Sequence, residues 1–438
     1  MYRKNLLRVM LAAALVISFI LSACQSAPAP SAPAKAEAPK AEAPKAEAPK
    51  AEAPKAEAKP AEAPKAEAKP AAKEPYKLGL LWEATGAAAA AGVGAEIREG
   101  AILEADRINA AGGIDGHQVQ LVIEDNGSDP TKTATAIAKL TRDDKVSIIL
   151  GPAFSPVYGA AINTAEREQT PIIIGDVPSK EMQAQGLKWT IPGPQPDEQA
   201  QAYGIINILK DKGFTKIVAI SSSEPNQEGP LNQVKKDGQA AGITVLTTGD
   251  TFGPMDLDMT AQAQKVKALA TQEKAQALFL STWFLPASTF IKGMQQLGFS
   301  IPIVGHQTFA DLIALRQFGA QLNGATVASY KLYAQEKLAD DDPQKPLIVD
   351  FNKRFQAKYN KAPSAAGQIG ADWVGVAAAA LKTAGADRTK LRDAMKGMTN
   401  QVLLSSVENL SSYNHFQKQS MAIYNIKDSK FEYVRSLK

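Results

Sequence analysis

The chain has 438 residues, of which 45% are hydrophobic and 21% are charged, and its formal net charge at pH 7 is +4. Basic residues before Tyr76 supply this whole surplus, so residues 76–438 are close to neutral. The charge balance therefore gives no support for a nucleic-acid partner, and the single cysteine excludes a disulfide within the chain. Residues 76–438 are long enough to form two domains of ordinary size.

The N-terminus has the layout of a secretory signal. A basic start that includes Arg3, Lys4 and Arg8 precedes an apolar stretch, residues 9–23. This stretch is shorter than the roughly 20 residues that a membrane-spanning helix needs. Cys24 follows Leu-Ser-Ala, an arrangement that resembles the lipobox of bacterial lipoproteins. The resemblance implies that residues 1–23 are removed and that Cys24 carries a lipid anchor. The alternative is an uncleaved anchor with an incidental cysteine, and either way we expect an exported chain that stays at a membrane.

Residues 24–75 are expected to form a tether. After Cys24 the unit Ala-Pro-Lys-Ala-Glu recurs in register, as at residues 38–42 and 43–47. Proline at every fifth position prevents a continuous helix, and the absence of aromatic or branched aliphatic side chains leaves nothing to form a core. This composition predicts a semi-rigid polyproline-type spacer that holds a globular part away from the membrane.

From Tyr76 onward, short apolar segments alternate with amphipathic ones. The predicted strands of the first half are residues 77–81, 119–123, 146–150 and 171–174, and its predicted helices are 97–108, 132–142 and 156–169. The second half repeats the pattern with strands 216–221, 243–247, 277–280 and 301–304 and helices 198–212, 229–241, 259–271 and 285–297. The remaining predictions are strands 324–332, 421–426 and 431–434 and helices 346–359 and 372–384. Alternation of this kind predicts an α/β fold with two doubly wound parallel sheets and a ligand cleft between the two lobes.

The sequence offers no catalytic, nucleotide-binding or metal-binding motif. Gly92 and Gly94 follow the first predicted strand, but position 97 is isoleucine, so the dinucleotide-binding pattern fails at its third glycine. The three histidines, His117, His306 and His415, are too scattered for a metal motif. We therefore expect a binding protein without a cofactor or metal, and not an enzyme.

Ser155 is the first candidate for ligand binding. It precedes Pro156 and an amphipathic segment, which is typical of a helix N-cap followed by proline at the first helical position. One interpretation is a purely structural cap. The other adds a ligand carboxylate, because a helix N-terminus presents free N–H groups and positive potential.

Two motifs in the first half resemble those of branched-chain amino-acid-binding proteins, the extracytoplasmic receptors of one class of ABC importer. They are residues 106–116 (DRINAAGGIDG) and 124–130 (EDNGSDP), and the order of motifs matches over most of residues 76–438. The resemblance implies the type I periplasmic-binding-protein fold, with two lobes joined by three hinge crossovers. It places residues 76–194 and 327–402 in lobe 1 and residues 195–326 and 403–438 in lobe 2. It also implies a monomer that closes on its ligand and delivers it to permease and ATPase subunits.

The same resemblance assigns roles to individual residues. Ser155 matches the family serine that holds the ligand carboxylate, and Trp283 falls where the family often has an aromatic side chain over the ligand. The family threonine that contacts the ligand falls near Asp176, in a segment where Pro178 lacks a donor, so the expected substitute is Ser179 or a shifted loop.

The family acid that pairs with the ligand ammonium falls at Gln307, and a neutral amide binds a cation more weakly than a carboxylate does. Asp176 or Glu83 is the expected replacement, with Asp372 a more distant one. Aromatic residues gather in the same loops, and we expect two or three of them to line the cleft. They are Trp82, Phe154, Trp283, Phe284 and Phe309.

These departures from the family pattern widen the range of expected ligands. It is a small carboxylate-bearing solute: an amino acid, of the branched-chain type by resemblance, or an aromatic or amide relative. The competing function is a membrane-tethered sensor that passes its occupancy to a signalling partner, because transport receptors and sensors use the same fold.

Overall fold

The computed structural model describes residues 73–89, 92–175, 185–254, 256–410 and 418–438. Residues 69–438 form one compact unit. The expected signal segment, Cys24 and nearly all of the expected tether lie outside the described residues, as do Asp176 and Ser179. In the part that is described, no helix combines the length and the hydropathy needed to cross a membrane.

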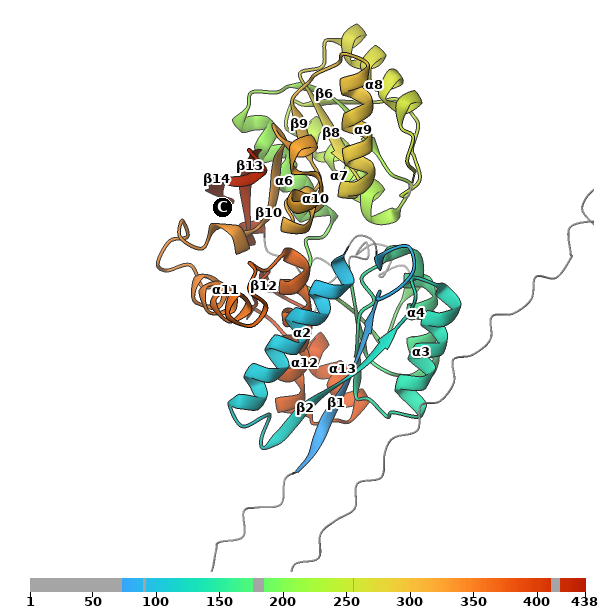
Figure 1. The fold of residues 1–438 in the computed structure, drawn as a ribbon, viewed down its shortest axis with the longest axis vertical. Coiled ribbons are helices and arrows are strands. Elements are labelled where there is room, and N and C mark those ends of the chain that lie inside the picture. The colour runs from blue at the N-terminus through green and yellow to red at the C-terminus, as the bar shows by residue number, and fades with distance from the viewer. Residues whose placement is uncertain (1–72, 90–91, 176–184, 255, 411–417) are drawn as a thin grey trace, which may run out of the picture. The chain divides into compact units, whose positions relative to one another are not determined.

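The first lobe is built on a five-stranded parallel sheet in the order β2-β1-β3-β4-β5; Figure 1 labels β1 and β2 of this sheet. Its strands are β1 (Lys73–Trp82), β2 (His117–Asp125), β3 (Ile148–Leu150), β4 (Ile172–Ile174) and β5 (Thr190–Pro192). Both faces of this sheet are covered, which explains why β3 is apolar at every position. Ile148 and Leu150 belong to one hydrophobic cluster and Ile149 to another, so successive residues of the strand face opposite cores.

Helices cover the two faces of this sheet from different parts of the chain. One core contains side chains from α2 (Val93–Ala110), α12 (Ala365–Ala384) and α13 (Arg388–Lys396). The other contains side chains from α3 (Pro130–Arg142) and α4 (Tyr158–Glu168). Backbones of α2 and α12 come very close together, since a Cβ atom added to Gly100 would lie 1.7 Å from the carbonyl oxygen of Gly367. This approach explains why glycines stand at the crossing of the two helices.

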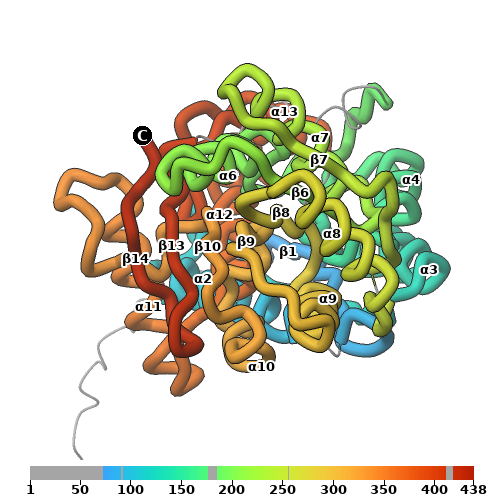
Figure 2. Tube along the Cα trace, turned by 90° about the horizontal axis from the view of Figure 1, so that it is seen from above, coloured from blue at the N-terminus to red at the C-terminus, as the bar shows by residue number. Residues whose placement is uncertain are grey.

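The second lobe is built on a seven-stranded sheet in the order β14-β13-β10-β9-β8-β6-β7 (Figure 2). Five strands are parallel: β6 (Lys216–Ser221), β7 (Thr244–Thr247), β8 (Ala277–Ser281), β9 (Ile303–Gly305) and β10 (Thr326–Tyr330). The C-terminal hairpin of β13 (Met421–Lys427) and β14 (Lys430–Ser436) adds two antiparallel strands beside β10, so this sheet is mixed. Its helices are α6 (Glu198–Asp211), α7 (Pro225–Ala240), α8 (Thr260–Glu273), α9 (Phe284–Gln296) and α10 (Leu312–Leu322).

The chain passes between the lobes three times. It leaves the first sheet after β5, returns after β10 through α11 (Lys345–Tyr359), and leaves again after the short pair β11 (Gln401–Val402) and β12 (Val407–Glu408). This topology confirms the expected type I periplasmic-binding-protein fold. The expected boundary at residue 327 falls inside β10, which hydrogen-bonds to β9 and β13 of the second sheet, so the return crossing follows Tyr330.

Candidate ligand-binding cleft

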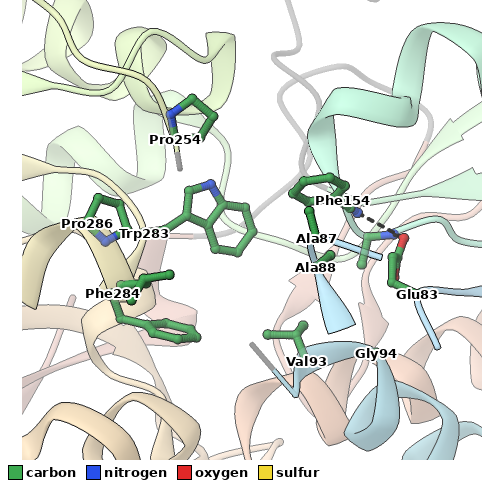
Figure 3. Close-up of a pocket in the computed structure, with 12 residues that line it drawn as sticks. Glu83, Ala87, Ala88, Val93, Gly94, Phe154, Pro254, Trp283, Phe284 and Pro286 are labelled. Carbon is green, nitrogen blue, oxygen red and sulfur yellow. Dashed lines mark hydrogen bonds between the residues drawn. The ribbon is translucent and has the colours of Figure 1, made fainter. Parts of the chain in front are cut away.

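Two neighbouring hollows lie between the lobes. The first encloses about 620 Å³ of space free of atoms, a volume that includes the open solvent at its mouth. Its lining comes from the loops after β1 and β3 and the start of α2 in the first lobe, and from the start of α9 and a loop in the second (Figure 3). The second hollow shares four of these residues, namely Val93, Ala153, Trp283 and Phe284, so the two form one continuous cleft.

The first hollow is lined mainly by apolar side chains. Figure 3 shows the Trp283 indole projecting from the second lobe toward Phe154 and Ala87 of the first. Phe284 and Pro286 lie on the Trp283 side, and Val93 lies at the start of α2. Three of the five aromatic residues expected near the cleft therefore line it: Phe154, Trp283 and Phe284.

The other two expected aromatic residues have different surroundings. The guanidinium of Arg98 lies 5.4 Å from the centre of the Trp82 ring, in cation–π geometry. Phe309 is fully buried in the core of the second lobe, against Gly305. Neither is among the described residues that line the two hollows.

The second hollow carries the polar groups of the cleft. Gln195 comes from the first crossover, Asn226 from the start of α7, and Gln307, Thr308 and Asp311 from the segment after β9. Three amide oxygens among them, Gln195 Oε1, Asn226 Oδ1 and Gln307 Oε1, are buried and have no hydrogen-bond partner. Buried polar atoms without a partner are uncommon in folded proteins, so these oxygens mark the expected place of a ligand's hydrogen-bond donors.

Glu224 joins the two lobes beside the cleft. It stands at the N-cap of α7, and its Oε1 atom accepts hydrogen bonds from Ser155 Oγ at 3.0 Å and from Trp283 Nε1 at 2.9 Å. Its other oxygen accepts from Ser222 Oγ at 2.9 Å. Burial raises the pKa of this carboxyl, while the three donors act in the opposite direction.

Ser155 is not the helix cap that the sequence suggested. The 3₁₀ helix η2 (Ser155–Val157) begins at Ser155 itself, with Phe154 at the N-cap and no side-chain cap. The hydroxyl of Ser155 instead points across to Glu224, and Ser155 is not among the described lining residues. The capping prediction is therefore wrong, because Phe154 occupies the N-cap position and no backbone N–H of the helix donates to a side-chain cap.

Glu83 and Asp372, two acids that the sequence suggested as partners of a ligand ammonium, instead accept hydrogen bonds from the protein itself. Glu83 is 3% exposed, and its Oε1 atom accepts hydrogen bonds from Asn126 Nδ2 and from the backbone N–H groups of Ala153 and Phe154. Asp372 is likewise buried and accepts the backbone N–H groups of Leu404 and Ser405. Desolvation raises the pKa of both carboxyls, to about 7 for Asp372.

Of the residues predicted for the site, Phe154, Trp283 and Gln307 line the cleft, whereas Ser155 and Trp82 are not among the described residues that line it. Asp176 and Ser179 lie outside the described residues. Glu224, Asn226 and Asp311 were missed. All three follow strands of the second sheet at their carboxyl ends, the position at which α/β sheets bind ligands.

Comparisons with known proteins agree with this geometry. Residues 75–430 match the family described as "Periplasmic binding protein". A leucine-, isoleucine-, valine-, threonine- and alanine-binding protein from Pseudomonas aeruginosa is 26% identical over 307 residues, which cover 69% of this chain and 77% of that protein. A Leu/Ile/Val-binding protein from Rhizobium johnstonii is 22% identical over 228 residues, which cover 52% of this chain and 60% of that protein.

Solved structures show the same fold. The branched-chain amino-acid transporter substrate-binding protein LivJ from Streptococcus pneumoniae, in complex with isoleucine, has a TM-score of 0.69 and 23% identity, covering 82% of this chain and 99% of that chain. The leucine-binding protein LivK from Thermotoga maritima has a TM-score of 0.68 and 20% identity, covering 82% and 97%.

The class defined by the two lobes, three crossovers and interlobe cleft is that of an extracytoplasmic solute-binding protein. The chain belongs to the periplasmic binding protein family, which confirms the resemblance found in the sequence motifs. Its relatives are substrate-binding proteins, so the chain is a binding protein and not an enzyme.

Proposed function

We propose that the chain is the substrate-binding component of an ABC importer, which captures a small solute between its lobes and delivers it to permease subunits. The observation that carries this proposal is the cleft itself, because both lobes supply its lining. A ligand in such a cleft is enclosed only when the lobes are together, so binding and closure are linked. The names of the relatives make aliphatic amino acids the first ligands to test.

Binding and closure are tested on the purified full chain. Calorimetric titration with leucine, isoleucine, valine and phenylalanine measures binding, and small-angle scattering measures whether the radius of gyration falls at saturation. A ligand at 100 times its Kd adds about 2.7 kcal/mol to the free energy of unfolding, which also raises the melting temperature. Binding without any change in the scattering would contradict closure around the ligand.

Anchoring and delivery need a cellular experiment. Cys24→Ser is expected to release the chain from the membrane fraction, because this variant lacks the thiol that carries the lipid. Deletion of the gene is expected to abolish uptake of the radiolabelled solute. Unchanged uptake together with a changed transcriptional response to the solute would instead favour the tethered sensor.

A further inference from the structure

The described residues that line the cleft include two carboxylates and no lysine, arginine or histidine. The carboxylates belong to Glu83 and Asp311, which are 3% and 8% exposed. Burial is the main reason why the pKa of each is raised, to about 7 for Asp311. A ligand carboxylate in this cleft would therefore meet acidic groups in surroundings that screen charge poorly, without a basic partner among the described residues.

The donors in the first lobe that are suited to an anion are already taken by the protein's own carboxylates. The backbone N–H groups of Ala153 and Phe154 donate to Glu83 Oε1 at 3.2 and 3.3 Å. The hydroxyl of Ser155 donates to Glu224 Oε1 at 3.0 Å. A ligand carboxylate that displaced either acid would leave a buried carboxylate short of partners, which is strongly unfavourable.

Several buried acceptors of the cleft have no hydrogen-bond partner. Gln195 Oε1, Asn226 Oδ1 and Gln307 Oε1 are all buried without a partner, and Asn226 and Gln307 are 4% and 9% exposed. Asp311 lines the same hollow, and its carboxylate accepts hydrogen bonds from the backbone N–H groups of Ile313, at 2.6 Å to Oδ1, and of Ala366. A carboxylate has room for further donors beside these two. A ligand group with several N–H donors satisfies such a set, whereas a carboxylate offers it no donor.

The neighbouring hollow suits an apolar body. Phe154, Trp283 and Phe284 surround it in Figure 3, and Trp283 and Phe284 also line the second hollow. One ligand of amino-acid size can therefore place its polar end against the amide oxygens and its apolar end against the aromatic rings.

We infer that the cleft selects a solute with an N–H-donating head, a protonated amine or a neutral amide, on an apolar body and without a free carboxylate. This inference rests on the proposed function and narrows its ligand. It departs from the carboxylate-bearing solute expected from the sequence. The resemblance implied that Ser155 binds the ligand carboxylate, but in the structure the Ser155 hydroxyl donates to Glu224.

Four matched probes test the inference by calorimetric titration of the full chain at pH 7. They are leucine, leucinamide, 3-methylbutylamine and 4-methylpentanoate, which share one apolar body and differ in the head group. We expect leucinamide and the amine to bind at least tenfold more tightly than leucine, and the carboxylate alone not to bind. Tighter binding of leucinamide, which carries both an amine and an amide, than of the amine alone would show that the amide adds to the recognition of the head.

Other outcomes overturn the inference. If leucine binds as tightly as leucinamide, or if 4-methylpentanoate binds, the inference fails while the proposed function stands. If none of the four probes binds to a chain that unfolds cooperatively, the inference fails, and so does the proposal that the solute is of amino-acid size.

Two variants locate the head group. Asp311→Asn keeps an oxygen to cap α10 but removes the charge, and we expect it to weaken binding of the amine about tenfold. Gln307→Glu is expected to strengthen it by a similar factor, because a carboxylate binds a cation more strongly than an amide does. The matched control is Asp387→Asn, which changes an N-cap aspartate of α13 that lines neither hollow. Unchanged amine affinity in both cleft variants would overturn the assignment.

Discussion

The hydrogen bond between Ser155 and Glu224 is expected to stabilise the closed arrangement of the lobes, whatever ligand is bound. Ser155 belongs to the first lobe and Glu224 to the second, so any separation of the lobes breaks the 3.0 Å contact. The other donors to this carboxylate, Ser222 and Trp283, lie in the second lobe and stay with it. Ser155→Ala therefore removes an interaction of the closed state alone.

The structure sets the expected loss of ligand affinity in Ser155→Ala. A hydrogen bond to an ionised group contributes about 1.5–3 kcal/mol, and Glu224 is only 6% exposed, so solvent weakens the bond little. If closure accompanies binding, Ser155→Ala lowers the affinity for every ligand by about 10- to 150-fold. Glu224→Gln keeps an acceptor but removes the charge, and a neutral bond is about half as strong.

A double-mutant cycle separates this role from a contact with a ligand carboxylate. Ligand affinity is measured by calorimetry at pH 8 for the wild type, Ser155→Ala, Glu224→Gln and the double variant. The expected coupling energy is about 1 kcal/mol, the difference between a charged and a neutral hydrogen bond. Ser288→Ala is the control, because the hydroxyl of Ser288 bonds within its own lobe to the carbonyl of Leu285. Additive effects, or a loss confined to carboxylate ligands, would refute the reasoning.

Three further predictions concern stability, measured by urea unfolding. Gly100→Ala is expected to lower the free energy of unfolding by about 2–3 kcal/mol, because its Cβ would lie 1.7 Å from the backbone of α12. The control is Gly375→Ala, in α12 itself, where no atom lies within 4 Å of the added Cβ. This control is expected to raise the free energy of unfolding by about 0.5–1 kcal/mol. Asp372→Asn is expected to cost about 1–3 kcal/mol, since an amide cannot accept both backbone N–H groups that the two carboxylate oxygens accept; an unchanged unfolding midpoint would contradict this. Burial lowers the pKa of His306 from 6.5 to about 3, so only the unfolded chain gains a proton here as the pH falls below 6.5. Between pH 6.5 and pH 4 the free energy of unfolding of the wild type should fall by about 3 kcal/mol relative to that of His306→Asn. Parallel pH profiles of the two proteins would contradict the lowered pKa of His306.

The order of strands and helices was largely predictable, because buried parallel strands are apolar on both faces and so stand out from amphipathic helices. The helix α10 was missed. It has non-helical backbone angles at Phe318, and its apolar residues follow those of the preceding segment without a clear break. The helix α13 was also missed, since it buries only Leu391 and Met395 along nine residues.

The site was less predictable than the fold, because its contacts join loops that are far apart in sequence. The family resemblance assigned Trp283 and Gln307 to the site, and both line the cleft. It gave no role to Glu224, whose partner Ser155 lies 69 residues earlier in the chain and in the other lobe. Such a pairing depends on how the lobes face each other, which local periodicity does not report.

Trp283 is expected to link ligand binding to closure of the lobes. Its ring lines both hollows, and its Nε1 atom donates to the same Glu224 oxygen that accepts from Ser155. A ligand that packs against the ring holds the indole where Nε1 meets Glu224, and this in turn keeps the carboxylate in reach of the first lobe. If the ligand binds only the closed form and the free chain is mostly open, whatever strengthens the closed form strengthens ligand binding by the same factor. We therefore expect the affinity to depend on the Ser155–Glu224 bond as well as on the ligand's own contacts, so that a variant loses binding without touching the ligand.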